Sequence, residues 1–125
     1  MAQILIIEDN EQNLYLESFI LMAAGHAVVQ ARHGAEGIAL AAAVLPDLIL
    51  LDIQLPGMDG YAVAKALRQQ TLLAATPIVA VTSYAMVGDR EHILAAGCNG
   101  YIEKPINPDT FVSEVGSHLL GTTIS

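Results

Sequence analysis

The chain has 125 residues, more than half of them hydrophobic, a formal net charge of −8 and a single cysteine, Cys98. Its length fits one domain, its acidic surface argues against binding to nucleic acid or acidic lipids, and a lone cysteine excludes an internal disulfide, as expected for a cytoplasmic protein. No hydrophobic run approaches the roughly 20 residues of a membrane span, so we expect no membrane association.

The first predicted strand covers residues 3–7 ("QILII"), and a helix is predicted over residues 10–24. Asn10 is a suitable N-cap and Gly25 ends the helix. The apolar spacing within this helix predicts one buried face, made of Leu14, Tyr15, Phe19, Met22 and Ala23. Residues 27–31 ("AVVQA") then return to a strand pattern.

The middle of the chain continues this alternation. An alanine-rich helix is predicted over residues 34–44, because Pro46 stops it. The aliphatic run "LILL" at 48–51 predicts a strand, and a helix follows at about 60–70.

The last part of the chain repeats the pattern twice. Strands are predicted at 78–82 ("IVAVT") and 100–103 ("GYIE"), and helices at about 86–96 and 108–120. Pro108 suits the first turn of the last helix, and residues 121–125 are expected to form a frayed tail.

Five strands thus alternate with five helices, and the strands are continuous hydrophobic runs. This combination predicts an α/β fold in which helices bury both faces of a parallel sheet. The sequence shows no internal repeat or linker, so we expect one domain over residues 1–125.

Polar side chains collect where the predicted strands end. In chain order they are Glu8 and Asp9, Asp52, Thr82 and Ser83, and Lys104 with Pro105. Ligands of open α/β sheets bind outside the carboxyl ends of the strands. We therefore expect these residues to form one site.

Three acids at one sheet edge need a counter-charge. Two like charges about 4 Å apart repel by about 4 kcal/mol at an effective dielectric constant of about 20. Magnesium suits such oxygen ligands and shares them with a phosphate, whereas His26, His33, His92 and His118 are too dispersed for a zinc site. A cation, a lysine, a hydroxyl and a nucleophilic aspartate together indicate phosphoryl chemistry.

Four motifs in this order resemble the receiver domains of two-component response regulators: "IIEDN" (6–10), "LLDIQLPGMDG" (50–60), "AVTSYA" (80–85) and "GYIEKPI" (100–106). The likeness covers essentially the whole chain. It implies a flavodoxin-like, doubly wound (βα)5 fold with strand order 2-1-3-4-5.

The resemblance also implies a role for each site residue. Asp52 would be the phosphorylated residue, and Asp9, Asp52 and the backbone carbonyl of Gln54 would bind Mg²⁺ (or Mn²⁺) directly. Glu8 would bind the cation through water. Lys104 would bind the phosphoryl group.

Further residues match the parts of the family that respond to phosphorylation. Thr82 would be the switch hydroxyl and Tyr101 the aromatic switch residue. A cis peptide between Lys104 and Pro105 would aim the lysine. The side chains of Gln54 and Tyr84 occupy positions that influence the loss of the phosphoryl group.

The resemblance therefore implies a phosphorylation-controlled switch and not a turnover enzyme. A histidine kinase or histidine phosphotransfer protein would phosphorylate Asp52, and a surface that binds a downstream protein would change. The protein would be a monomer or a weak, phosphorylation-dependent dimer.

Other interpretations remain open. The chain could be the receiver domain of a hybrid histidine kinase, although Met1 directly before the first strand favours a stand-alone regulator. A scaffold that kept only the fold is disfavoured by the intact acid, hydroxyl and lysine set. An aspartate-nucleophile phosphatase of the haloacid dehalogenase type needs a second aspartate where this chain has Gln54, which cannot act as a general acid.

Overall fold

The computed structural model describes residues 2–55, 59–83 and 87–124. Tyr84, the predicted helix start at residue 86 and residue 125 of the predicted tail lie outside the described residues. Within the described part of the chain, no helix is long and hydrophobic enough to cross a bilayer.

The centre of the molecule is a five-stranded parallel sheet in the order β2-β1-β3-β4-β5. Its strands are β1 (Gln3–Ile7), β2 (Ala27–Ala31), β3 (Leu48–Asp52), β4 (Ile78–Thr82) and β5 (Gly100–Glu103). The predicted fold class and strand order are confirmed. Strand β3 is one residue longer than predicted and ends on Asp52.

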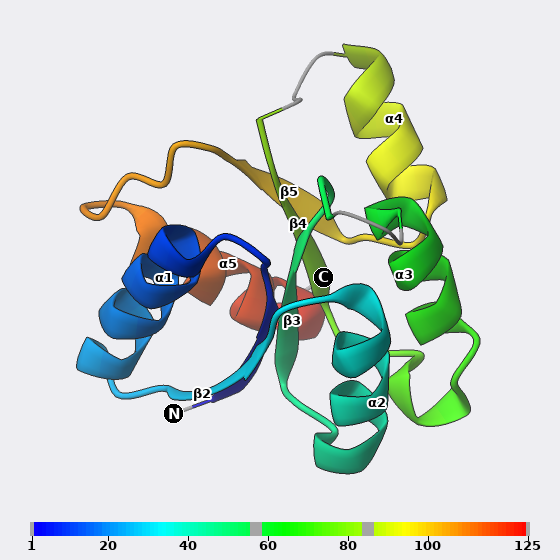
Figure 1. Cartoon of the computed structure of the whole chain (residues 1–125), viewed down its shortest axis with the longest axis horizontal. Coiled ribbons are helices and arrows are strands. Elements are labelled where there is room, and N and C mark those ends of the chain that lie inside the picture. The colour runs from blue at the N-terminus through cyan, green and yellow to red at the C-terminus, as the bar shows by residue number, and fades with distance from the viewer. Residues whose placement is uncertain (1, 56–58, 84–86, 125) are drawn as a thin grey trace.

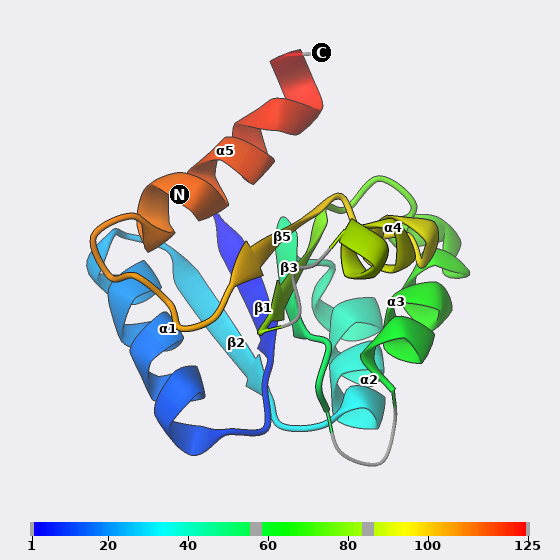
Figure 2. The same ribbon diagram turned by 90° about the horizontal axis from the view of Figure 1, so that it is seen from above.

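Helices cover both faces of this sheet, as Figure 1 and Figure 2 show. They are α1 (Glu11–Ala23), α2 (Gly34–Val44), α3 (Gly60–Arg68), α4 (Val87–Ala95) and α5 (Phe111–Ile124), with a 3₁₀ turn η1 (Thr71–Leu73) after α3. Helices α1 and α5 lie on one face, and α2, α3 and α4 on the other.

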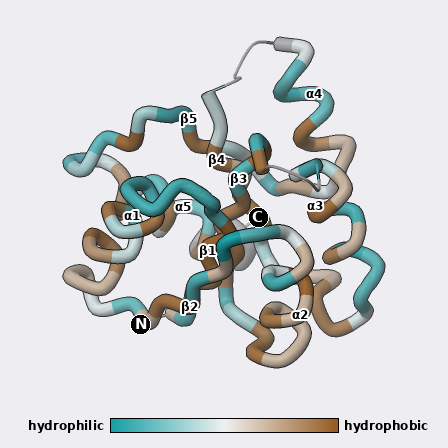
Figure 3. Tube along the Cα trace, viewed as in Figure 1, coloured by the Kyte–Doolittle hydropathy of each residue, from teal (hydrophilic) through white to brown (hydrophobic). Residues whose placement is uncertain are grey.

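Alternate residues of the central strands pack into two hydrophobic cores, one on each face of the sheet. Leu5 and Leu51 face the core under α2, α3 and α4, whereas Ile4 and Leu50 face the core under α1 and α5, where Phe111 is fully buried. Figure 3 shows the resulting concentration of hydrophobic residues along β1. Strands buried on both faces explain why their sequences are continuous aliphatic runs.

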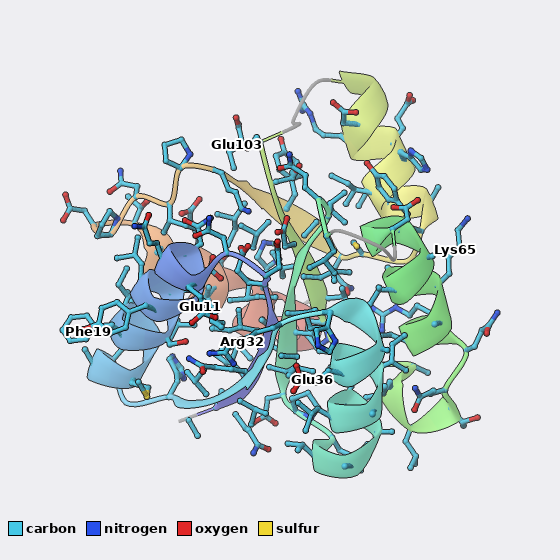
Figure 4. All side chains as sticks on the ribbon, viewed as in Figure 1. Glu11, Phe19, Arg32, Glu36, Lys65 and Glu103 are labelled. Atoms are coloured by element: carbon cyan, nitrogen blue, oxygen red, sulfur yellow. The ribbon has the colours of Figure 1, made fainter. Side chains whose placement is uncertain are left out.

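The predicted buried face of α1 is confirmed at Leu14 and wrong at its other four residues. Tyr15, Phe19 and Met22 are 70%, 58% and 54% exposed, and Ala23 is also exposed. Figure 4 shows Phe19 projecting away from the sheet. The buried stripe is instead Leu14, Glu17, Ser18 and Leu21. Both sets of residues have three- and four-residue spacings, so the periodicity alone could not choose between them.

The ends of the helices follow the expected chemistry in α1 and depart from it in α5. The side chain of Asn10 caps α1 by accepting a hydrogen bond from Asn13 N at 2.9 Å. Helix α5 starts at Phe111, later than predicted, because Asn107 Oδ1 and Asn107 O accept hydrogen bonds from Asp109 N and Phe111 N and form a turn first. The helix also includes residues 121–124, for which we predicted a frayed tail.

Side chains also join α3 to the segments around it. Tyr61 of α3 stacks on His92 of α4, with ring centroids 3.7 Å apart and an interplanar angle of 7°. Arg68 donates hydrogen bonds to Thr76 O at 2.7 Å, Gly97 O at 2.8 Å and Leu73 O at 2.9 Å. These contacts fasten the end of α3 to the turns that precede β4 and β5.

Candidate functional site

The three predicted acids lie together at the carboxyl edge of the sheet. One carboxylate oxygen from each of Glu8, Asp9 and Asp52 lies within 4.8 Å of the others. Glu8 is 1% exposed and Asp52 is 3% exposed, whereas Asp9 is open to solvent. An entering cation would therefore meet two buried carboxylates and one exposed carboxylate.

The register of the sheet brings these residues together. Ile7 of β1 lies opposite Leu51 of β3, so the next residues, Glu8 and Asp52, lie side by side at the edge of the sheet. Asp52 in turn lies opposite Val81 of β4. Thr82, the last residue of β4, is fully buried at the same edge.

Lys104 links the two buried acids. Its Nζ lies 3.2 Å from Glu8 Oε1 and 3.4 Å from Asp52 Oδ1. Burial alone would lower the pKa of Lys104, but the carboxylates of Glu8 and Asp52 raise it above its ordinary value. The lysine is therefore a permanent cation between two acids.

One lysine does not balance this much negative charge. Burial, followed by the hydrogen bond and charge of Asp52, raises the pKa of Glu8 to about 7. A group with that pKa releases its proton readily when a cation arrives. The donor set consists only of oxygens, which are the ligands that Mg²⁺ and Mn²⁺ prefer.

The loop after Asp52 is held close to the site. Gln54 N donates a hydrogen bond to Asp52 Oδ1 at 2.9 Å, and Gln54 Oε1 accepts one from Ser83 N at 3.1 Å. At Gly60, a Cβ atom would lie 2.5 Å from the Cα of Ile53. The absence of a side chain at Gly60 allows α3 to start directly against this loop.

The remaining predicted residues lie on or beside β5. The Lys104–Pro105 peptide is cis, the form that the resemblance implied. Tyr101 is partly buried, and the guanidinium carbon of Arg90 lies 5.9 Å from the centre of its ring. This contact joins β5 to α4.

Two features near the site were not anticipated from the sequence. Glu17, on the buried stripe of α1, is 1% exposed. Burial and the neighbouring Glu8 raise its pKa to about 8. Arg32, directly after β2, forms an ion pair with Glu11 at the start of α1, and Figure 4 shows the two side chains next to each other.

Residues 4–116 match the response regulator receiver domain. The chain belongs to this family. As a receiver domain, it is a signalling module of the two-component type, and its acidic cluster fits the cation site that such proteins carry.

Known proteins similar to this receiver domain include both stand-alone regulators and a kinase module. It is 42% identical to the polar-differentiation response regulator DivK of Brucella anthropi over 93% of this chain and 94% of that protein. The chemotaxis response regulator CheY4 of Vibrio cholerae has a TM-score of 0.91 at 30% identity, covering 94% of this chain and 98% of that one. The receiver domain of a histidine kinase from Syntrophus aciditrophicus has a TM-score of 0.87 at 30% identity, covering 100% of this chain and 95% of that one.

Proposed function

We propose that this receiver domain is a magnesium-dependent switch that is phosphorylated on Asp52. The observation that carries the proposal is the arrangement of three acids with one oxygen each within 4.8 Å, two of which, Glu8 and Asp52, are paired with the half-buried Lys104. Such a set is costly unless it holds a cation beside a reactive carboxylate.

The cation site would use the residues that the sequence predicted. Asp9, Asp52 and the backbone carbonyl of Gln54 would bind Mg²⁺ or Mn²⁺ directly, and Glu8 would bind it through water. When bound, the cation would neutralise charge on the transferring phosphoryl oxygens.

Phosphoryl transfer to Asp52 requires mainly that the donor and the carboxylate are correctly positioned. A carboxylate oxygen of Asp52 attacks the phosphorus of a phosphohistidine. The new P–O bond forms as the P–N bond breaks, and the electron pair of that bond stays on the imidazole nitrogen of the donor. Lys104 already lies 3.4 Å from Asp52 Oδ1, so its ammonium group is in place to stabilise the oxygens that arrive there.

Thr82 and Tyr101 would transmit the change. Thr82 ends the strand next to Asp52 and would donate a hydrogen bond to a phosphoryl oxygen. Movement of β4 toward the phosphoryl group would then change the packing of Tyr101, which contacts Arg90 of α4. We propose that the altered surface of α4, β5 and α5 binds a downstream protein.

The partner that donates the phosphoryl group would be a histidine kinase or a histidine phosphotransfer protein. It would dock beside the site on α1, where Tyr15 and Phe19 stack with ring centroids 6.1 Å apart and stay largely exposed. We propose that the protein acts in the cytoplasm, is not a turnover enzyme, and is a monomer or a weak dimer when phosphorylated.

Acetyl phosphate provides the direct test. We expect intact-mass spectrometry to show one phosphoryl adduct that needs Mg²⁺, is lost in hydroxylamine and is absent in Asp52→Asn. An adduct that forms to the same extent when a chelator removes Mg²⁺, or that still forms in Asp52→Asn, contradicts the proposal. Release of inorganic phosphate from many unrelated esters would instead favour a phosphatase.

A further inference from the structure

The peptide group that joins Thr82 to Ser83 is held from two sides. Thr82 O accepts a hydrogen bond from Lys104 N at 2.9 Å, on the side of β5. Ser83 N donates a hydrogen bond to Gln54 Oε1 at 3.1 Å, on the side of β3. Thr82 is the last residue of β4, so these two contacts help to fix where the end of this strand lies.

The side-chain contact comes from the loop that follows Asp52. Gln54 N donates a hydrogen bond to Asp52 Oδ1 at 2.9 Å. The residues on either side of Gln54, Ile53 and Leu55, are buried, whereas Gln54 itself is exposed. The main chain of Gln54 is therefore anchored beside Asp52, while its side chain bonds to a residue 29 positions further along the chain.

Gln54 thus bridges the acid that is proposed to accept the phosphoryl group and the end of β4. A phosphoryl group on Asp52 would bring three strong acceptor oxygens to this edge of the sheet. The backbone N–H of Ser83 carries a single hydrogen, and Gln54 Oε1 accepts it in this structure. The side chain of Gln54 and the phosphoryl group would therefore compete for the same donor.

We propose that Gln54 is a positioning residue whose side-chain amide holds the end of β4 in its unphosphorylated position. Phosphorylation would release Ser83 N from Gln54, and Thr82 would then be able to move toward the phosphoryl oxygens. The inference rests on the proposed function, because the group that replaces Gln54 is the phosphoryl group on Asp52. Gln54 thus stabilises the state before phosphorylation and opposes the change to the state after it.

The size of the effect follows from one hydrogen bond. A contact that is made in one of two states shifts their equilibrium by its net contribution to that state. The bond between Gln54 and Ser83 is open to solvent, so its contribution lies at the low end of the range for neutral hydrogen bonds. We expect its removal to favour the phosphorylated arrangement by about threefold.

One substitution removes this bond and has a matched control. Gln54→Met keeps the length of the side chain and removes the acceptor for Ser83 N. Gln69→Met is the same change at an exposed glutamine at the other end of α3. Thermal melts followed by circular dichroism verify that both variants fold. The amide hydrogen of Ser83 should exchange with water faster in Gln54→Met than in the wild type, because it has lost its acceptor.

The readout is the dissociation constant for beryllium fluoride, a stable analogue of the phosphoryl group. It is measured on the full chain at saturating Mg²⁺ by nuclear magnetic resonance spectroscopy. We expect Gln54→Met to bind the analogue about threefold more tightly and Gln69→Met to bind it like the wild type. A structural defect would weaken binding, so a gain in affinity is specific to the loss of this hydrogen bond.

The possible results separate the inference from the proposed function. Unchanged or weaker binding in Gln54→Met, an equal gain in Gln69→Met, or unchanged exchange of the Ser83 amide overturns the inference alone. A wild-type chain that binds no beryllium fluoride in the presence of Mg²⁺ overturns the proposed function as well.

Discussion

Stability should depend on pH in an unusual direction in this receiver domain. Most carboxyl groups ionise more easily after folding and favour the folded state at neutral pH. Here the pKa of Glu8 is about 7 and the pKa of Glu17 is about 8, both raised first by burial from 4.5. A raised pKa in the folded state means that stability present below pH 4.5 is lost as the pH rises through 7 and 8.

The magnitude follows from the size of the shifts. One pKa unit corresponds to about 1.4 kcal/mol, so the rise from 4.5 to about 8 in Glu17 alone corresponds to roughly 5 kcal/mol. The charge of Glu8 also raises the pKa of Glu17, so the contributions of the two groups do not simply add. Burial also lowers the pKa of His118, and protonation of this histidine opposes the trend in acid. We expect a net loss of roughly 3 kcal/mol between about pH 5 and about pH 8.

The assay is urea unfolding followed by far-ultraviolet circular dichroism across this pH range, with a chelator present. Glu17→Gln should flatten the profile, because it removes the group with the largest shift. Glu103→Gln removes one negative charge from the exposed end of β5 and should leave the profile unchanged. Stability that rises from about pH 5 to about pH 8, or a slope that Glu17→Gln does not alter, would refute the reasoning.

Three further changes test the scaffold around the site by urea unfolding. Arg68→Met should lower the free energy of unfolding by about 3 kcal/mol, because several carbonyls lose a charged donor; a cost no larger than that of Lys65→Met, at an exposed position of the same helix, would contradict this. Gly60→Ala should lower the free energy of unfolding by about 2 kcal/mol or more, since its Cβ would overlap the backbone of Ile53. An unchanged free energy of unfolding would show that the loop shifts to make room for the methyl group. Leu45→Gly should raise the free energy of unfolding by about 0.5 kcal/mol, because Leu45 has a φ of 52°, a left-handed conformation that glycine adopts without strain. A lower free energy of unfolding would mean that the apolar contacts of Leu45 outweigh this strain.

The place of the acids was predictable because it depends on topology. Parallel strands present their carboxyl ends at one edge, so residues at the carboxyl ends of β1 and β3 had to lie near each other. Glu8, Asp9 and Asp52 do lie together. Their roles in binding Mg²⁺ and accepting a phosphoryl group stay predictions that the acetyl phosphate experiment tests.

The outer face of α1 was not predictable in the same way. Tyr15 and Phe19 have the spacing of a buried stripe, and apolar residues are usually buried. The structure exposes them because Leu14 and Leu21 occupy the inner stripe instead. Choosing between the two stripes requires knowledge of how α1 is rotated on the sheet, which local spacing does not contain.

Glu17 and Arg68 show a second limit of predicting burial from the sequence. A charged residue is normally placed on the surface because its burial costs several kcal/mol. Glu17 is buried on the inner stripe of α1 beside Leu14 and Leu21, and Arg68 is partly buried because carbonyls from the segment before β4 and from the turn before β5 surround its guanidinium. Both placements depend on how the helices pack in three dimensions, so no local pattern reveals them.

The stack of Tyr61 on His92 is an intrinsic spectroscopic probe of how α3 and α4 are packed. The chain has no tryptophan, so its tyrosines dominate the near-ultraviolet spectrum. A sliding of α4 over α3 by a small fraction of a ring width would change the asymmetry around the Tyr61 chromophore and the ring-current shifts of the His92 protons. Rearrangement of this pair of helices can therefore be followed in the unmodified chain, without attaching a dye.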